Sequence, residues 1–229
     1  IVQNIILLSK ISKMMHRTDY MQNGLKNKPV LLIITGPQGS GNHLFSKIFS
    51  YHKDVYGWNA LYKNKWVGHD QEVFQPYWLE PKKLSEFDWT QSKYFVTSIS
   101  CPFVLNKKLT TPKYRPFVKQ AKKYATVKIA IIGRDKNIMK QQQLRVRKGK
   151  HTAPVALQHL RLLDNAFYLS HELFFLYGID YVKSIAKQLD FPISTGSYVR
   201  GLLKEESNKK YVKYAKKGKF DSCQFKINY

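Results

Sequence analysis

The chain has 229 residues, of which 24% are charged and 43% hydrophobic, and its formal net charge is +24 at pH 7. This length and composition are those of one globular domain with a full hydrophobic core. No apolar run approaches the roughly 18 residues that a membrane helix needs, so the composition excludes such a helix and predicts a soluble protein.

The large positive charge predicts a surface that attracts polyanions, such as nucleotides, nucleic acids, anionic lipids or acidic glycans. Lys greatly outnumbers Arg, and Asn, Ile, Tyr and Phe are also plentiful. Because an AT-rich genome produces the same composition, the charge indicates the sign of a ligand and not its identity.

Cysteine usage and the first residues bear on the compartment. Cys101 and Cys223 are too few for a disulfide framework or a zinc cluster, and no Cys-x-x-Cys pair occurs. The apolar residues 1–8 precede the positive charge and lack a small-residue cleavage site, so they do not resemble a signal peptide. We therefore expect a cytoplasmic protein in which residues 1–28 form an N-terminal extension or derive from an upstream start.

The first strong pattern is a strand followed by a glycine-rich loop and a helix. Residues 30–35 are continuously apolar and β-branched, which suits a parallel strand covered on both faces. The chain then runs into glycines, and apolar residues recur at helical spacing beyond them, at Leu44, Phe45, Ile48 and Phe49. This order is typical of domains that bind a phosphate between strand and helix.

Strands and helices alternate along the rest of the chain. We expect strands at residues 94–100 and 127–132, and helices at residues 116–124, 136–147, 154–165 and 180–189. Such alternation predicts a mostly parallel sheet with right-handed crossovers. The expected fold class is α/β: a three-layer P-loop fold over residues 29–205, with a central, mostly parallel sheet flanked by helices.

Two segments lack a clear period. Residues 58–89 are rich in aromatics, Pro and charge, and they form an insertion where an α/β protein often builds its substrate pocket; a packed surface loop is the alternative. Residues 206–229 form a basic tail in which residues 209–219 interleave Lys with Tyr. That pattern suits a nucleic-acid strand as well as a solvated tail.

The glycine loop carries the clearest functional signal. Gly36 and Gly41 are separated by four residues, so backbone N–H groups can converge on a phosphate at the N-terminus of the following helix. The usual nucleotide-hydrolase motif continues with Lys and Ser or Thr, whereas this chain has Asn42 and His43. Without that Lys and hydroxyl, ordinary Mg²⁺-dependent ATP hydrolysis is disfavoured, although a tight turn alone also explains the glycines.

The loop Gly39-Ser40-Gly41-Asn42-His43-Leu44 resembles the phosphosulfate loop of sulfotransferases, whose common form reads Lys-Ser-Gly-Thr-Thr-Trp. These enzymes use 3′-phosphoadenosine 5′-phosphosulfate as cosubstrate and no metal. The resemblance implies cosubstrate binding by a set of loop residues: Gly36, Gly39, Ser40, Gly41, Asn42 and His43. Gly39 stands where the family has its Lys, and His43 either replaces that positive charge or only caps the helix.

Two further elements agree with the resemblance. The strand ending in Gly133-Arg134-Asp135 matches the family's Arg-Asp-Pro or Arg-Asn-Pro, which implies that Arg134 binds the 3′-phosphate of the cosubstrate. Gln142 stands where the family has a Ser that joins the Arg, and its amide can still donate a hydrogen bond. The segment around Glu172 resembles the family's Tyr-Glu-Asp-Leu, which implies a structural role for Glu172.

A transferase of this kind needs a base for the acceptor, normally His or Glu. Many relatives have Thr-His after the second strand, but residues 97–102 contain no His. The insertion offers His69 and Glu72, where an acidic neighbour can raise the basicity of an imidazole. The candidate catalytic residues are therefore His43, His69 and Glu72. Helix capping is the alternative for His43, and the role of a lone surface His is the alternative for His69.

Three functions follow as expectations. The first is a sulfotransferase-like enzyme that moves a sulfuryl group from 3′-phosphoadenosine 5′-phosphosulfate to an unknown hydroxyl or amine acceptor. The second is a P-loop kinase or nucleotide hydrolase with a degenerate loop, which would need Mg²⁺. The third is a non-catalytic module that binds nucleic acid through the basic tail.

Overall fold

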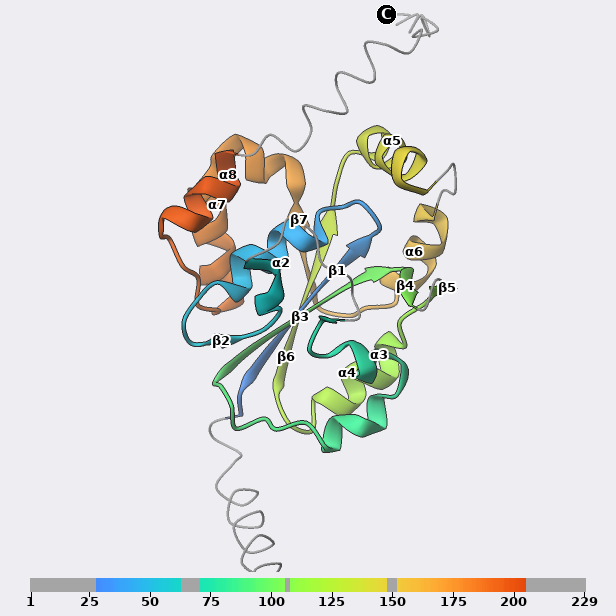
Figure 1. Cartoon of the computed structure of the whole chain (residues 1–229), viewed down its shortest axis with the longest axis vertical. Helices are drawn as coiled ribbons and strands as arrows, with labels where there is room; N and C mark the ends of the chain where they lie inside the picture. The colour runs from blue at the N-terminus through green and yellow to red at the C-terminus, as the bar shows by residue number, and fades with distance from the viewer. Residues whose placement is uncertain (1–27, 63–70, 106–107, 148–151, 205–229) are drawn as a thin grey trace, which may run out of the picture.

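The computed structural model describes residues 28–62, 71–105, 108–147 and 152–204, so residues 1–27 of the N-terminal extension, His69 and the basic tail lie outside the described residues. The described chain forms a five-stranded, all-parallel sheet in the order β2-β3-β1-β6-β7, flanked by helices (Figure 1). A separate antiparallel pair joins β4 (Phe103–Leu105) to β5 (Lys108–Thr110). The expected three-layer α/β architecture with a mostly parallel sheet is confirmed.

Strand β1 (Val30–Pro37) lies at the centre of the sheet. It pairs with β3 (Tyr94–Cys101) from Val30↔Tyr94 to Pro37↔Cys101, and on its other side with β6 (Thr126–Gly133). The strand reads as a continuous apolar run because both of its faces are covered by helices.

Alternate residues of β1 enter two separate cores, because successive side chains of a strand point to opposite faces. Leu31 and Ile33 belong to the core under α4 (Tyr114–Ala121) and α6 (Ala153–Leu160). Leu32 and Ile34 belong to the core under α2 (Asn42–Ser50), α7 (His171–Leu189) and α8 (Ser197–Lys204). Helix α5 (Lys136–Arg147) lies at the top of Figure 1, beyond the carboxyl ends of the strands.

The outer strands were not expected from the sequence. β2 (Val55–Tyr56) has two residues, too few for a periodic signal, and β7 (Ala166–Ser170) begins after α6 has ended at Leu160. The expected helix over residues 154–165 is therefore too long at its end. The last helix expected, over residues 180–189, is the second part of α7, whose course is interrupted at Gly178 with φ of 52°.

The aromatic insertion, residues 58–89, contributes to the hydrophobic core on one face of the sheet. It contains the short helix α3 (Gln75–Leu79) and the 3-10 helices η1 (Asn59–Tyr62) and η3 (Pro81–Ser85). Phe74 and Trp78 are fully buried, and Trp78 stacks on Phe117 of α4 with ring centroids 3.7 Å apart. The insertion thus covers one face of the sheet, and its pattern is irregular because short helical turns follow no single period.

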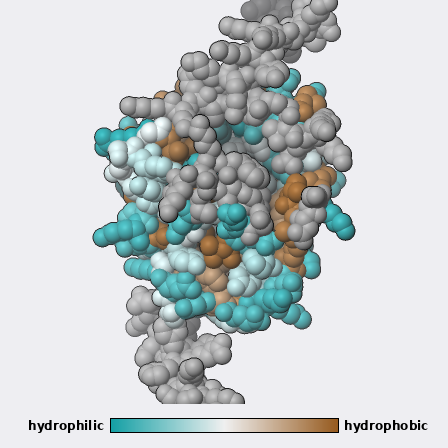
Figure 2. Space-filling view, viewed as in Figure 1, coloured by the Kyte–Doolittle hydropathy of each residue, from teal (hydrophilic) through white to brown (hydrophobic). Residues whose placement is uncertain are grey.

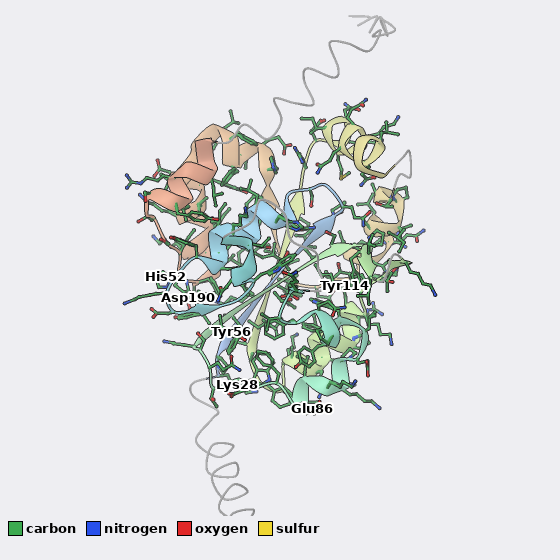
Figure 3. All side chains as sticks on the ribbon, viewed as in Figure 1. Lys28, His52, Tyr56, Glu86, Tyr114 and Asp190 are labelled. Atoms are coloured by element: carbon green, nitrogen blue, oxygen red, sulfur yellow. The ribbon has the colours of Figure 1, made fainter. Side chains whose placement is uncertain are left out.

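A buried hydroxyl pair ties α4 to the central strand. Thr35 donates from Oγ1 to the carbonyl of Ile99 (2.8 Å), and the hydroxyl of Tyr114 lies 2.6 Å from the same Oγ1. Because the Thr35 proton is used on Ile99, Tyr114 is the donor of the second bond. Figure 3 shows Tyr114 directed from α4 toward the middle of the sheet.

Hydrophilic residues cover much of the described surface that is visible in Figure 2, and brown apolar patches break it on the right, where Figure 1 places α6 and the β4–β5 pair. The exposed apolar side chains on these elements are Val104, Leu109, Val155 and Leu157. Among the described residues, no helix combines the length and the apolarity that crossing a membrane requires.

We expect Phe117→Ala to lower the free energy of unfolding by about 3–5 kcal/mol, because it removes a fully buried ring and leaves a cavity against Trp78. Urea unfolding followed by circular dichroism measures the change. The control is Leu157→Ala at a side chain that is 62% exposed, for which we expect a change within about 0.5 kcal/mol. Equal losses in the two variants would contradict this account of the core.

Candidate anion-binding site

The carboxyl ends of β1 and β6 form the point where the chain connections diverge. Helix α2, which follows β1, packs on one face of the sheet, whereas α6, which lies between β6 and β7, packs on the other. In open α/β sheets, ligands bind in the crevice at such a switch point. The glycine loop leaves β1 here, and Arg134 follows β6 directly.

Two glycines give the loop its shape. Gly39 has φ of 90° and Gly41 has φ of 114°, a left-handed region that side-chain-bearing residues rarely adopt. Gly41 is also the N-cap of α2, and no side chain caps this helix. As a glycine, Gly41 offers no side chain of its own to cap the first N–H groups of α2, at the helix end where anions bind.

Gly36 is required for space rather than for backbone conformation. A Cβ atom on it would lie 2.5 Å from Oγ of Ser40 and 2.8 Å from the carbonyl oxygen of Ile132. Ser40 is itself fully buried, and its N–H donates to the carbonyl of Pro37 at 3.1 Å. Both residues therefore shape the loop from within, and the structure does not aim the Ser40 N–H at a ligand.

Arg134 connects β6 to the loop. Its Nη1 donates to the carbonyl oxygen of Gly39 at 2.6 Å and to Oε1 of Gln142 at 2.7 Å. Three residues that the sequence selected separately are thus in direct contact. Since the oxygen of the Gln142 amide accepts from Arg134, the amide nitrogen is the atom of this side chain that can donate to an anion.

A buried network of hydrogen bonds attaches the loop to neighbouring helices. Gln143 donates from Nε2 to the carbonyl oxygen of Gln38 at 2.7 Å and accepts the N–H of Thr152 at 3.0 Å. Thr152 in turn donates its hydroxyl to Oε1 of Gln38 at 3.1 Å. All three side chains are buried, so the network fixes Gln38 of the loop to α5 and to the start of α6. The sequence offered no signal for it beyond a run of three Gln.

Asn42 and His43 begin α2 and point in different directions. Asn42 is buried and donates from Nδ2 to Oγ of Ser100 at 2.8 Å, which ties the helix to the carboxyl end of β3. His43 is half-buried, and its ring lies 5.0 Å from the ring of Trp58. The insertion therefore positions His43 through an aromatic contact.

Glu72 lies inside the protein and apart from the loop. It is 3% exposed, and Oε2 accepts the N–H of Phe74 at 3.1 Å. Burial raises the pKa of this carboxyl from 4.5 to about 8, against the opposing effect of hydrogen bonds from Thr97, Phe74 and Ser98. At neutral pH the carboxyl is mostly protonated, so it lacks the charge that a general base needs. Its partner in the catalytic hypothesis, His69, lies outside the described residues.

His171 is a site residue that the sequence analysis missed. It opens α7 directly after β7, is 1% exposed, and packs against the loop at Gly41. The next residue, Glu172, accepts the N–H of Asp135 at 2.7 Å, and Asp135 caps α5 by accepting the N–H groups of Asn137 and Ile138. Glu172 therefore joins two elements of the site, in keeping with the structural role expected for it.

Comparison with known proteins adds nothing to this geometry, because no family model matches the chain and no curated protein sequence resembles it significantly. Within the described ranges, no group of three or more His, Cys, Asp or Glu side chains is placed to hold a metal ion.

We expect Glu72→Gln to change how stability depends on pH. Glu72 ionises near pH 4.5 when unfolded and near pH 8 when folded, so its contribution to stability is complete below pH 4.5 and is lost as pH rises through 8. Between pH 5.5 and 7.5, the unfolding free energy of the wild type should fall relative to that of the variant by up to about 1.4 kcal/mol per pH unit. Urea unfolding at both pH values measures this.

The control is Glu80→Gln, at an exposed glutamate that pairs with Lys83 at 2.8 Å. This variant should follow the pH dependence of the wild type. If Glu72→Gln also follows it, the Glu72 carboxyl is ionised in the folded protein and our account of its burial is wrong.

Proposed function

We propose that this chain is a sulfotransferase-like enzyme that uses 3′-phosphoadenosine 5′-phosphosulfate and passes its sulfuryl group to a hydroxyl or amine acceptor. The observation that carries the proposal is the contact of Arg134 with both Gly39 of the loop and Gln142 of α5. A nucleotide that carries a phosphate at both its 3′ and 5′ positions offers one anion to the loop and a second to the Arg fork.

The loop chemistry favours this cosubstrate over a Mg²⁺ nucleotide. Asn42 and His43 occupy the positions where a nucleotide hydrolase has Lys and a metal-binding hydroxyl, and Asn42 is turned toward β3 by its bond to Ser100. Strands β3 and β6, which flank β1, end in Ser100-Cys101 and in Gly133. Neither end supplies the Asp that holds Mg²⁺ in such enzymes.

The proposed reaction is a displacement at sulfur. The acceptor oxygen or nitrogen bonds to sulfur, the bond from sulfur to the bridging phosphate oxygen breaks, and that oxygen leaves with the electron pair as part of 3′-phosphoadenosine 5′-phosphate. The acceptor proton passes to a base or to water. Catalysis of this kind depends on positioning and on stabilising the charge of the leaving group.

In the proposal, the N–H groups at the start of α2 and His43 lie on the side of the leaving group. His43 is the ionisable residue of the loop, and its contact with Trp58 holds the ring at the helix start. The acceptor then approaches from the side of the insertion, which contributes Trp58.

We expect 3′-phosphoadenosine 5′-phosphate to bind more tightly than adenosine 5′-phosphate, because only the former offers a 3′-phosphate to Arg134. Arg134→Ala should remove most of this preference, about 1.5–3 kcal/mol for a charge-assisted hydrogen bond. Isothermal titration calorimetry with both ligands measures it. Arg161→Ala, at an exposed residue after α6, is the control and should keep the preference. Equal affinities of the wild type for the two ligands would refute the cosubstrate assignment.

Gly41→Ala tests the loop directly. The new Cβ would lie 2.7 Å from Cδ2 of His171 and would sit on a residue with φ of 114°, so we expect a loss of about 1–3 kcal/mol in stability and at least a tenfold loss in affinity for the bisphosphate. Gly133→Ala is the matched control at the end of β6, where the nearest atom to the Cβ is 3.7 Å away. It should bind normally. A folded Gly41→Ala protein with wild-type affinity would place the anion elsewhere.

A further inference from the structure

His171 is a buried imidazole that packs against Gly41 of the proposed anion site. A Cβ on Gly41 would approach its Cδ2 to 2.7 Å and its Nε2 to 3.3 Å, so the ring edge rests on the loop backbone. Phe45 of α2 packs edge-on against the ring with centroids 6.4 Å apart, and Phe175 of α7 lies 5.0 Å away. The ring is therefore held between the loop, α2 and its own helix.

The charged side chain that acts most directly on His171 is positive. The guanidinium of Arg134 acts on the ring, and together burial and this positive charge lower the pKa of His171 to about 3, burial being the larger cause. Glu172, the next residue, has its carboxylate engaged by the N–H of Asp135 and the hydroxyl of Ser170. The faces contributed by Gly41, Phe45 and Phe175 carry no charge. Without a ligand, the imidazole is neutral at every physiological pH.

The ring also retains an unused polar atom. Nδ1 is buried and has no hydrogen-bond partner within the part of the chain that the structure describes. A buried polar group left unpaired costs about 1–3 kcal/mol, so a packing role alone is better served by an apolar ring.

We propose that His171 is a specificity-determining residue of the anion site, which takes up a proton when a multiply charged phosphate ligand binds beside Arg134 and the glycine loop. The ligand brings several negative charges next to the ring in a poorly solvated site, where electrostatic interactions are strong. The protonated ring is a second cation beside Arg134. It forms only with a ligand whose negative charge is large enough to offset the cost of burying a charged imidazole. This inference rests on the proposed function, because it takes the bisphosphate as the ligand.

Proton uptake by His171 links the affinity for the ligand to pH. If the ring is neutral in the free protein and protonated in the complex, the pH lies between the two pKa values of His171 in these states. Within that pH range, affinity rises about tenfold for each unit by which pH falls. The phosphates of the ligand also titrate, with a second pKa near 6, but they contribute equally in a variant that lacks the imidazole. The difference between wild type and variant therefore isolates His171.

The test is calorimetric titration with 3′-phosphoadenosine 5′-phosphate at pH 5.5 and 8.0, in buffers of different ionisation enthalpy, which gives the protons taken up on binding. His171→Phe keeps an aromatic ring and His171→Asn keeps polarity, while neither titrates. At pH 5.5 we expect the wild type to take up close to one proton more than either variant, and at pH 8.0 a smaller difference. His52→Asn, at a histidine that follows the C-cap of α2, is the control and should match the wild type.

A second measurement needs no variant. The ¹⁵N chemical shifts of the two His171 ring nitrogens in the wild-type protein should report a neutral ring without ligand and a protonated ring with the bisphosphate at pH 5.5. A neutral ring in the complex, or equal proton uptake by wild type and variants, overturns this inference and leaves the proposed function standing wherever the bisphosphate still binds. Absence of bisphosphate binding by the wild type overturns both.

Discussion

The site depends on one constraint: β1 is hydrogen-bonded along both edges and covered by helices on both faces. A strand in this position cannot shift or twist without breaking two ladders and two cores. Its carboxyl end is therefore a fixed point, and the glycines beyond it turn the chain into α2 at a defined place. Arg134 reaches the same place because β6 runs parallel to β1 and ends at the same edge of the sheet. The rigid sheet thus brings together residues from distant parts of the sequence.

Sequence reasoning succeeded where periodicity and burial act together. β1, β3 and β6 are long strands buried on both faces, and each appeared as an apolar β-branched run within one or two residues of its observed bounds. It failed where an element is short or takes its form from its neighbours. β2 exists because its two residues pair with β3, and the insertion is helical because its aromatic side chains fill a core that the rest of the fold provides.

The candidate site divides in the same way. Gly39, Gly41 and Arg134 could be selected from sequence, because positive φ values and phosphate recognition restrict residue type strongly. The Gln38–Gln143–Thr152 network and the position of His171 could not, because each depends on contacts between elements that only the assembled sheet defines. The burial of Glu72 could not be predicted either, because it depends on the packing of the insertion against the sheet, which the sequence does not reveal.

The parallel order of the strands also affects how the protein folds during its synthesis on the ribosome. Val30 finds its first partner at Tyr94 and its second at Thr126, so the central strand emerges long before either ladder can form. At a translation rate of roughly 5–20 residues per second, β1 waits on the order of 5–20 s for β6. The apolar strand has two open edges until β3 emerges and one open edge until β6 emerges, so the nascent chain is exposed to wrong pairing and to chaperone capture until the middle of its sheet is complete.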